Sequence, residues 1–237
     1  MSTPVNPIEL LEQVAEWLDD AGIQVVFTGG STVPLYLGPV AAQEFRATRD
    51  VDCIVDASDY AAYTKRTSQL RELGIHESQE EGAPMCRFVR EGLLIDVMPI
   101  DPEILGFSNP WYLGAWNHQA RQSLPSGRTV AVFPVEYLVA SKISAYESRG
   151  NADPYASHDF EDIVSLLDGA DHILDAVEAA APDVRDFVRS WLTALVARRD
   201  ALDLFEAHVS RVAGGHDRAL LLLESINRWI QVENRRG

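Results

Sequence analysis

Cysteine is scarce in this chain, since only Cys53 and Cys86 occur among its 237 residues. Two thiols are too few for a disulfide framework or for a closed four-ligand zinc site of their own. Long hydrophobic runs are also missing, and the longest fall far short of the ~20 residues that a membrane-spanning helix needs. The segment Met1–Pro7 is polar and lacks the basic start of a secretory signal. We therefore expect a cytoplasmic protein with two reduced, packed thiols and no membrane partner.

Basic residues are few as well: the chain has 20 Lys and Arg against 36 Asp and Glu, which gives a formal net charge of -16. A uniformly acidic surface repels polyphosphate, and this disfavours a protein that coats long nucleic acids. The charge leaves two alternatives open, namely a local basic groove and a nucleoside triphosphate whose charge is offset by bound Mg²⁺. Hydrophobic residues make up 46% of the chain, which is enough for a packed core.

The order of the secondary-structure signals predicts two parts. A helical pattern with Leu11, Val14 and Leu18 comes first, and short β-rich runs follow it up to residue 133. Two of these runs, 85–90 and 93–98, are separated by Glu91-Gly92 alone, which is the signal of a tight hairpin. Beyond residue 134 the pattern is helical. We expect an α/β (α+β) core with a small mixed β-sheet flanked by helices in residues 1–134, followed by a C-terminal helical domain in residues 135–237.

The first candidate site lies in the segment Thr48-Arg49-Asp50-Val51-Asp52-Cys53-Ile54-Val55. Because side chains alternate along a strand, Asp50 and Asp52 point to one face, while Val51 and Cys53 point to the core. Two adjacent carboxylates repel one another unless a cation lies between them, and hard oxygen ligands suit Mg²⁺ or Mn²⁺. The alternative is a solvent-exposed strand end with two ordinary acidic residues.

Asp96 favours the metal interpretation. It interrupts the apolar run Leu93-Leu94-Ile95-Asp96-Val97-Met98, where a buried acidic group needs a proton, a partner or a metal. If its strand lies beside that of Asp50 and Asp52, three carboxylates converge and can hold two divalent ions. Asp96 would then be a metal ligand or the base that accepts the proton of an attacking hydroxyl.

The tripeptide Gly29-Gly30-Ser31 follows the apolar run 23–27 and precedes the two aspartates. Glycine lets the backbone approach a ligand without hindrance from a Cβ atom, and a helix that begins at Ser31 offers free N–H groups to a phosphate. The alternative is a plain turn. The position between a strand and a helix favours a phosphate-binding loop.

Three segments together carry a resemblance to a known family: Phe27-Thr28-Gly29-Gly30-Ser31, Arg46-Ala47-Thr48-Arg49-Asp50-Val51-Asp52, and Leu94-Ile95-Asp96. They resemble the polymerase-β-type nucleotidyltransferase superfamily and, within it, the AbiEii/AbiGii-like toxin group of type IV toxin–antitoxin systems. The resemblance implies that a nucleotide's phosphates bind at Gly29, Gly30 and Ser31. It also implies three catalytic, metal-binding residues: Asp50, Asp52 and Asp96.

The resemblance extends into the helical part, which in this family would close the nucleotide cleft. Lys142 matches a family lysine that contacts the triphosphate, and Asp159 and Asp162 match the acidic positions of a K-D-x-x-D segment. His158 stands where that segment usually has its lysine, so a permanent cation is missing there. The alternatives are a solvated lysine and an acidic first helical turn that the helix dipole favours.

Arg46 and Arg49 flank the aspartates, and two roles are open for them. One is a guanidinium contact to the nucleotide, which we expect for Arg49. The other is an ion pair that relieves the repulsion between Asp50 and Asp52.

We expect a metal-dependent nucleotidyltransferase with Mg²⁺ or Mn²⁺ as cofactor and a nucleoside triphosphate as substrate. It would transfer a nucleoside monophosphate to an acceptor hydroxyl and release pyrophosphate. The toxin-like resemblance implies a tRNA or a protein as acceptor and a cognate antitoxin as partner. Two alternatives stay open: a small-molecule acceptor, as in antibiotic nucleotidyltransferases, and a degenerate protein that binds nucleotide or a partner without turnover.

Overall fold

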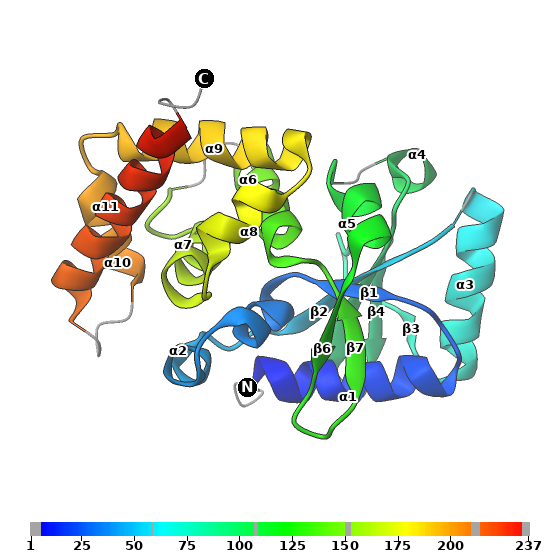
Figure 1. Cartoon of the computed structure of the whole chain (residues 1–237). Helices are drawn as coiled ribbons and strands as arrows, with labels where there is room; N and C mark the ends of the chain where they lie inside the picture. Colours follow the sequence, from blue (N-terminus) through cyan, green and yellow to red (C-terminus); the bar gives the residue numbers. More distant parts are fainter. Residues whose placement is uncertain (1–5, 58, 107–108, 150–152, 210–213, 234–237) are drawn as a thin grey trace. The chain divides into compact units, whose positions relative to one another are not determined.

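The computed structural model describes residues 6–57, 59–106, 109–149, 153–209 and 214–233. The chain divides into two compact units, one of Met1–Leu35 with Arg46–Pro134 and one of Tyr36–Phe45 with Val135–Gly237 (Figure 1). The sequence-based division at residue 134 assigns residues 36–45 to the first part, whereas the structure packs them with the second. The predicted fold class, a mixed sheet flanked by helices and followed by a helical part, is confirmed.

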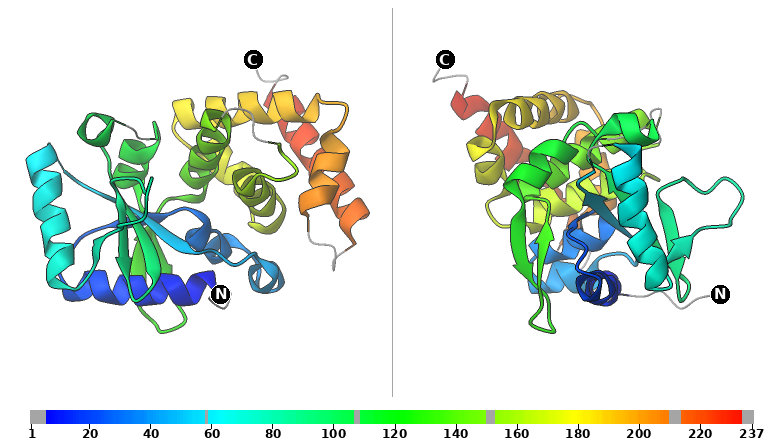
Figure 2. Two further views of the ribbon diagram at one scale, coloured as in Figure 1. Left: turned by 180° about the vertical axis from the view of Figure 1, so that it is seen from behind. Right: turned by 90° about the vertical axis from the view of Figure 1, so that its right-hand side faces the viewer.

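A seven-stranded sheet with the strand order β3-β4-β5-β2-β1-β7-β6 forms the centre of the first unit. Its strands are β1 (Val26–Thr28), β2 (Asp50–Val55), β3 (His76–Glu77), β4 (Arg87–Arg90), β5 (Leu93–Pro99), β6 (Ala120–Ser123) and β7 (Thr129–Val132). β2 is parallel to β5 and β1 is parallel to β7, whereas the other neighbours are antiparallel. In the right-hand view of Figure 2 the sheet extends from the β6–β7 hairpin at one edge to β3 and β4 at the other.

The hairpin of β4 and β5 turns at Glu91 and Gly92, as the sequence predicts. Their φ angles of 53° and 80° are the left-handed pair that a type I′ turn requires. The sequence pattern missed β3 and β6, because strands of two and four residues are too short to show a period. The aromatic, turn-rich stretch 109–119 shows no clear period in the sequence, and the structure has a short helix there, α5 (Tyr112–His118).

The other helices of the first unit are α1 (Pro7–Asp20), α3 (Tyr60–Glu72) and α4 (Pro102–Leu105). Asn6 starts α1, because its side chain accepts a hydrogen bond of 2.9 Å from the Ile8 amide. The guanidinium of Arg90 lies 4.2 Å from the ring centroid of Trp17 in α1. Since Arg90 points away from the face that carries Asp50, α1 packs on the opposite face of the sheet, the face of Val51.

The second unit is helical within the described residues. It contains α2 (Pro39–Glu44), α6 (Val135–Ser148), α7 (His158–Gly169), α8 (Ile173–Ala179), α9 (Pro182–Val196), α10 (Ala201–His208) and α11 (Gly215–Glu233). The Gly38 amide donates to the Gly169 carbonyl over 3.2 Å. A Cβ atom at Gly169 would lie 2.8 Å from Leu37 Cδ2, so glycine at the end of α7 lets segment 36–45 pack there.

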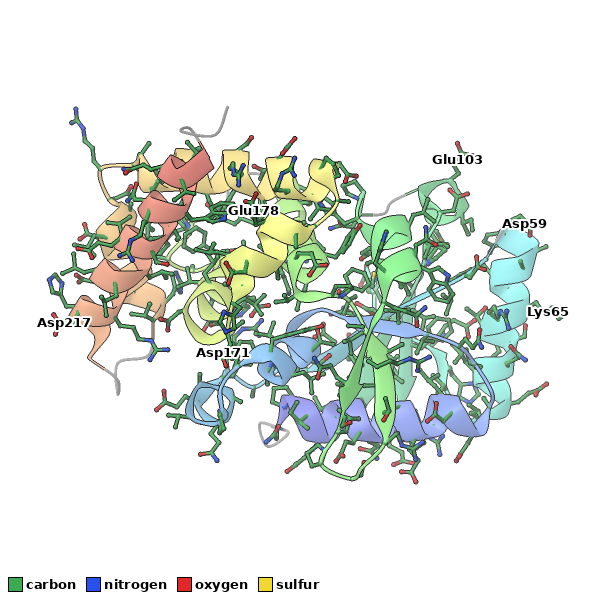
Figure 3. The ribbon with its side chains drawn as sticks, in the orientation of Figure 1. Asp59, Lys65, Glu103, Asp171, Glu178 and Asp217 are labelled. Atoms are coloured by element: carbon green, nitrogen blue, oxygen red, sulfur yellow. The ribbon has the colours of Figure 1, made fainter. Side chains whose placement is uncertain are left out.

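Exposed charge is spread along the chain. Figure 3 labels exposed acidic side chains on elements of both units, from Asp59 at the start of α3 to Asp217 in the first turn of α11. The negative net charge is therefore not confined to one segment. Among the described residues, no helix has both the length and the apolar character needed to cross a membrane.

Candidate functional site

The carboxylates of Asp50 and Asp52 lie at the beginning of β2. They alternate with the buried Val51 and Cys53, so both point to the same face of the sheet. Thr48, two residues before Asp50, donates a hydrogen bond of 2.9 Å from Oγ1 to Asp50 Oδ1. This bond fixes the direction of one carboxylate and leaves its other oxygen, Oδ2, turned toward the neighbouring strands.

Asp96 lies in β5, directly beside β2. The parallel register pairs Asp52 with Asp96, and the antiparallel register of β1 pairs Thr28 with Asp52. All three carboxylates therefore share one face of the sheet, with Asp52 and Asp96 side by side and Asp50 two residues before Asp52 along β2. Asp96 is only 7% exposed, which makes its charge dependent on a partner.

That partner is Arg87, a residue that the sequence analysis did not single out. Arg87 lies opposite Asp96 on β4, and its Nε and one terminal nitrogen contact the two carboxylate oxygens at 2.8 and 2.6 Å. The same terminal nitrogen lies 3.6 Å from Asp50 Oδ2. The hydrogen bonds with Asp96 raise the pKa of Arg87, against the lowering effect of desolvation.

A signal for this pair is present in the sequence. The two-residue turn places Arg90 opposite Leu93, and three steps back along both strands Arg87 faces Asp96. The predicted two-residue turn therefore also fixes the register that pairs Arg87 with Asp96.

Gly29 follows β1 with a φ of +77° and lies against Asp52. A Cβ atom on Gly29 would lie 1.9 Å from Asp52 Oδ2, so only glycine allows this approach. The helix that follows is a 3-10 helix, η1 (Gly30–Tyr36), and Ser31 lies inside it rather than capping it. The Thr32 hydroxyl instead donates to the Gly29 carbonyl over 2.9 Å.

The hydroxyl of Ser31 is buried, and among the described residues no hydrogen-bond partner reaches its Oγ. A buried hydroxyl without a partner is costly, because it loses its hydrogen bonds to water. The glycine turn thus places Gly29 directly against Asp52 and, two residues further on, carries a buried hydroxyl with no partner. Arg49, which directly precedes β2, has an exposed side chain.

Within the described parts of the chain, no group of three or more His, Cys, Asp or Glu side chains is arranged to hold a metal ion. The pairing of Asp96 with Arg87 gives a physical reason, because both oxygens of that carboxylate already accept hydrogen bonds. The metal-binding role of Asp50, Asp52 and Asp96 stays a prediction.

The remaining predicted residues lie in the second unit and form a buried ionic network. Lys142 Nζ lies 2.6 Å from Asp162 Oδ2 and 3.4 Å from Asp159 Oδ1, and Arg149 also contacts Asp159. Asp162 is fully buried and Lys142 is 9% exposed. The network joins α6 to α7, and Lys142 would have to loosen these contacts to meet a phosphate. Its predicted nucleotide contact, like those of Asp159 and Asp162, stays a prediction.

His158 begins α7 with an exposed side chain, and its Nδ1 lies 3.3 Å from Glu161 Oε2. It makes no contact with the buried network among the contacts described for α7. The two thiols are buried on the face of the sheet away from the carboxylates. Burial raises the pKa of Cys53 and raises that of Cys86 to about 12, so both stay protonated.

No family model matches this chain, and no curated protein matches it. Among solved structures, it is similar to the antibiotic-resistance factor ANT(2'')-Ia, with 16% identity and a TM-score of 0.48 over 81% of this chain and 96% of that one. It is also similar to an antigenic nucleotidyltransferase-like protein from Paracoccidioides brasiliensis, with 16% identity and a TM-score of 0.49 over 88% of this chain and 95% of that one. At this degree of similarity neither structure establishes an activity for this chain.

Proposed function

We propose that this protein is a metal-dependent nucleotidyltransferase, which transfers a nucleoside monophosphate from a nucleoside triphosphate to an acceptor hydroxyl. One observation carries the proposal: the strand register places the carboxylates of Asp50, Asp52 and Asp96 on one face of the sheet, and the Gly29 backbone lies directly against Asp52. A row of carboxylates beside a glycine turn suits a cation that is shared with a phosphate chain.

Asp50 and Asp52 offer the hard oxygen atoms that Mg²⁺ and Mn²⁺ prefer, and Asp96 would join them as a third ligand once Arg87 releases one of its oxygens. The absence of a Cβ atom at Gly29 lets the Asp52 carboxylate lie against the backbone of the glycine turn, and the Ser31 hydroxyl lacks a partner that a phosphate oxygen could supply. We assign Gly29, Gly30, Ser31 and Arg49 to the triphosphate.

In the reaction, the acceptor oxygen forms a bond to the α-phosphorus. The bond from that phosphorus to the oxygen bridging to the β-phosphate breaks, and pyrophosphate leaves with the electron pair. When bound, the divalent ion supplies Lewis-acid neutralisation of the charge on the phosphates. Thr48 holds the Asp50 carboxylate in place, Arg49 attracts the triphosphate, and an Asp96 oxygen that Arg87 releases takes up the proton of the acceptor hydroxyl.

The acceptor class that we propose rests only on the resemblance to the AbiEii/AbiGii-like toxin group, which favours a tRNA 3′ end or a protein hydroxyl over a small molecule. The experiment incubates the chain with Mg²⁺ or Mn²⁺, each of four α-labelled nucleoside triphosphates, and either total tRNA, a protein extract or a panel of small hydroxyl compounds. The fraction that takes up the label identifies both the nucleobase and the acceptor class, and pyrophosphate release confirms turnover.

Two variants test the assignment of the carboxylates. Asp50→Asn and Asp52→Asn should each lower incorporation by about 10²-fold or more, because a group that stabilises transition-state charge is lost. Asp56→Asn is the matched control, since it removes the same charge just beyond the other end of β2. Full activity of the Asp50→Asn/Asp52→Asn double variant would overturn the proposal.

The second candidate is a protein that binds nucleotide without turnover. The pairing of Asp96 with Arg87 favours it, because a carboxylate with both oxygens engaged is a poor base. This candidate predicts nucleotide binding that Asp52→Asn weakens, with no pyrophosphate release over prolonged incubation.

A further inference from the structure

Arg87 places a positive charge beside the carboxylates of Asp96 and Asp50, which would otherwise repel one another. It lies on β4, next in line after Asp96 of β5 and Asp52 of β2, so a positive side chain ends a row of acidic ones. The ladder with β5 fixes its backbone, and the guanidinium meets Asp96 through two parallel hydrogen bonds of 2.8 and 2.6 Å. Such bidentate pairs are the strongest that arginine makes with a carboxylate.

The guanidinium also reaches a second carboxylate, since one terminal nitrogen lies 3.6 Å from Asp50 Oδ2. Asp50 is one of the residues assigned to the divalent ion. Arg87 therefore neutralises part of the charge that would otherwise build up among three adjacent carboxylates. Its side chain is 24% exposed, so it is partly shielded from water at this position.

A divalent ion and this guanidinium compete for the same oxygen atoms. A metal bound to Asp96 needs a lone pair on an oxygen that Arg87 now engages, and two cations so close together repel each other. Anything that stabilises the metal-free arrangement lowers the apparent metal affinity by the same factor, because binding has to displace it.

We propose that Arg87 is an internal counter-cation of the carboxylate site, which a divalent ion has to displace from Asp50 and from at least one oxygen of Asp96. This inference rests on the proposed function, because it takes the three carboxylates as the metal site. Arg87 is then a positioning residue: its two hydrogen bonds hold the direction of the Asp96 carboxylate before the ion arrives, and it sets the metal affinity.

The test measures Mn²⁺ binding to the full chain without nucleotide, by titration calorimetry and by the electron paramagnetic resonance signal of free Mn²⁺. Arg87→Gln removes the competing charge and should lower the Kd for Mn²⁺ at least tenfold, while the melting temperature of the metal-free chain falls. The matched control is Arg90→Gln, which removes the same charge from the opposite face of the same strand and should leave the Kd unchanged.

Arg87→Lys provides a second variant should Arg87→Gln fail to fold. It keeps the charge but loses the two parallel hydrogen bonds, so its Kd should fall severalfold. An unchanged or higher Kd in the Arg87 variants, with Mn²⁺ still bound by the wild-type chain, would overturn the inference and leave the proposed function standing. Absence of Mn²⁺ binding in the wild-type chain and in every variant would overturn both.

Discussion

The contact between Gly29 and Asp52 can be tested with a single methyl group. In Gly29→Ala the new Cβ atom would lie 1.9 Å from Oδ2, 2.7 Å from Cγ and 2.8 Å from Cβ of Asp52. Rotation of the Asp52 side chain can move Oδ2 and Cγ away, but it cannot move the Asp52 Cβ atom. The end of β1 therefore has to separate from β2, which disturbs the pairing of Thr28 with Asp52.

The loss of folding stability in Gly29→Ala has two contributions that can be measured separately. A left-handed φ such as the +77° of Gly29 costs alanine about 1–2 kcal/mol by itself. Overpacking at a site that cannot yield adds about 1–3 kcal/mol. Gly74 is a matched control, because its φ is +75° and nothing lies within 4 Å of a Cβ atom built there. Gly74→Ala should therefore show the backbone cost alone, and Gly29→Ala should lose about 1–3 kcal/mol more.

The assay is urea denaturation of both variants, followed by circular dichroism, together with Mn²⁺ titration of the folded proteins. We expect Gly29→Ala to weaken Mn²⁺ binding, because Asp52 is displaced, and Gly74→Ala to leave it unchanged. Equal destabilisation of the two variants, with equal Mn²⁺ affinity, would refute the steric reasoning.

Three further predictions follow from single contacts. The pair of Lys142 and Asp162 is buried, so Asp162→Leu and Lys142→Met should each lower the free energy of unfolding by about 3–5 kcal/mol in urea denaturation. The double variant should lose far less than the sum of the two single losses. The exposed pair of Arg198 and Asp200 is the control, with an expected coupling energy of about 0–1 kcal/mol. Strictly additive costs at the buried pair would contradict a structural role. Thr48→Val removes the hydrogen bond to Asp50 and should raise the Kd for Mn²⁺ severalfold at a stability cost of about 1 kcal/mol, and an unchanged Kd would exclude a positioning role for Thr48. Burial raises the pKa of Cys86 to about 12 and keeps Cys53 protonated as well. Neither thiol should therefore react with a disulfide reagent at pH 8 until the chain is denatured. Rapid reaction of the native protein would show that the sheet opens at these cysteines.

Local sequence patterns were sufficient to predict those structural properties that depend only on residues close in sequence. The alternation of Asp50 and Asp52 with buried residues is a property of any strand, so their common face could be predicted before the fold was known. The same holds for the turn at Glu91-Gly92, because its residue types favour left-handed φ angles. The helical nature of the last third likewise follows from its period.

Long-range pairing decided the rest of the site. The parallel alignment of β2 with β5 sets Asp96 beside Asp52, and no local signal specifies which strands become neighbours or in which register. The bonds that Lys142 forms with Asp159 and Asp162 likewise depend on how α6 packs against α7.

The sequence by itself determined that two carboxylates, those of Asp50 and Asp52, lie on one face of a strand, because residue type and spacing along a strand decide which side chains share a face. Only the tertiary structure decided that Arg87 reaches the carboxylates of Asp96 and Asp50 and that segment 36–45 packs with the helical unit. The physical reason is that contacts between distant segments depend on the packing of whole elements, which no short window of sequence contains.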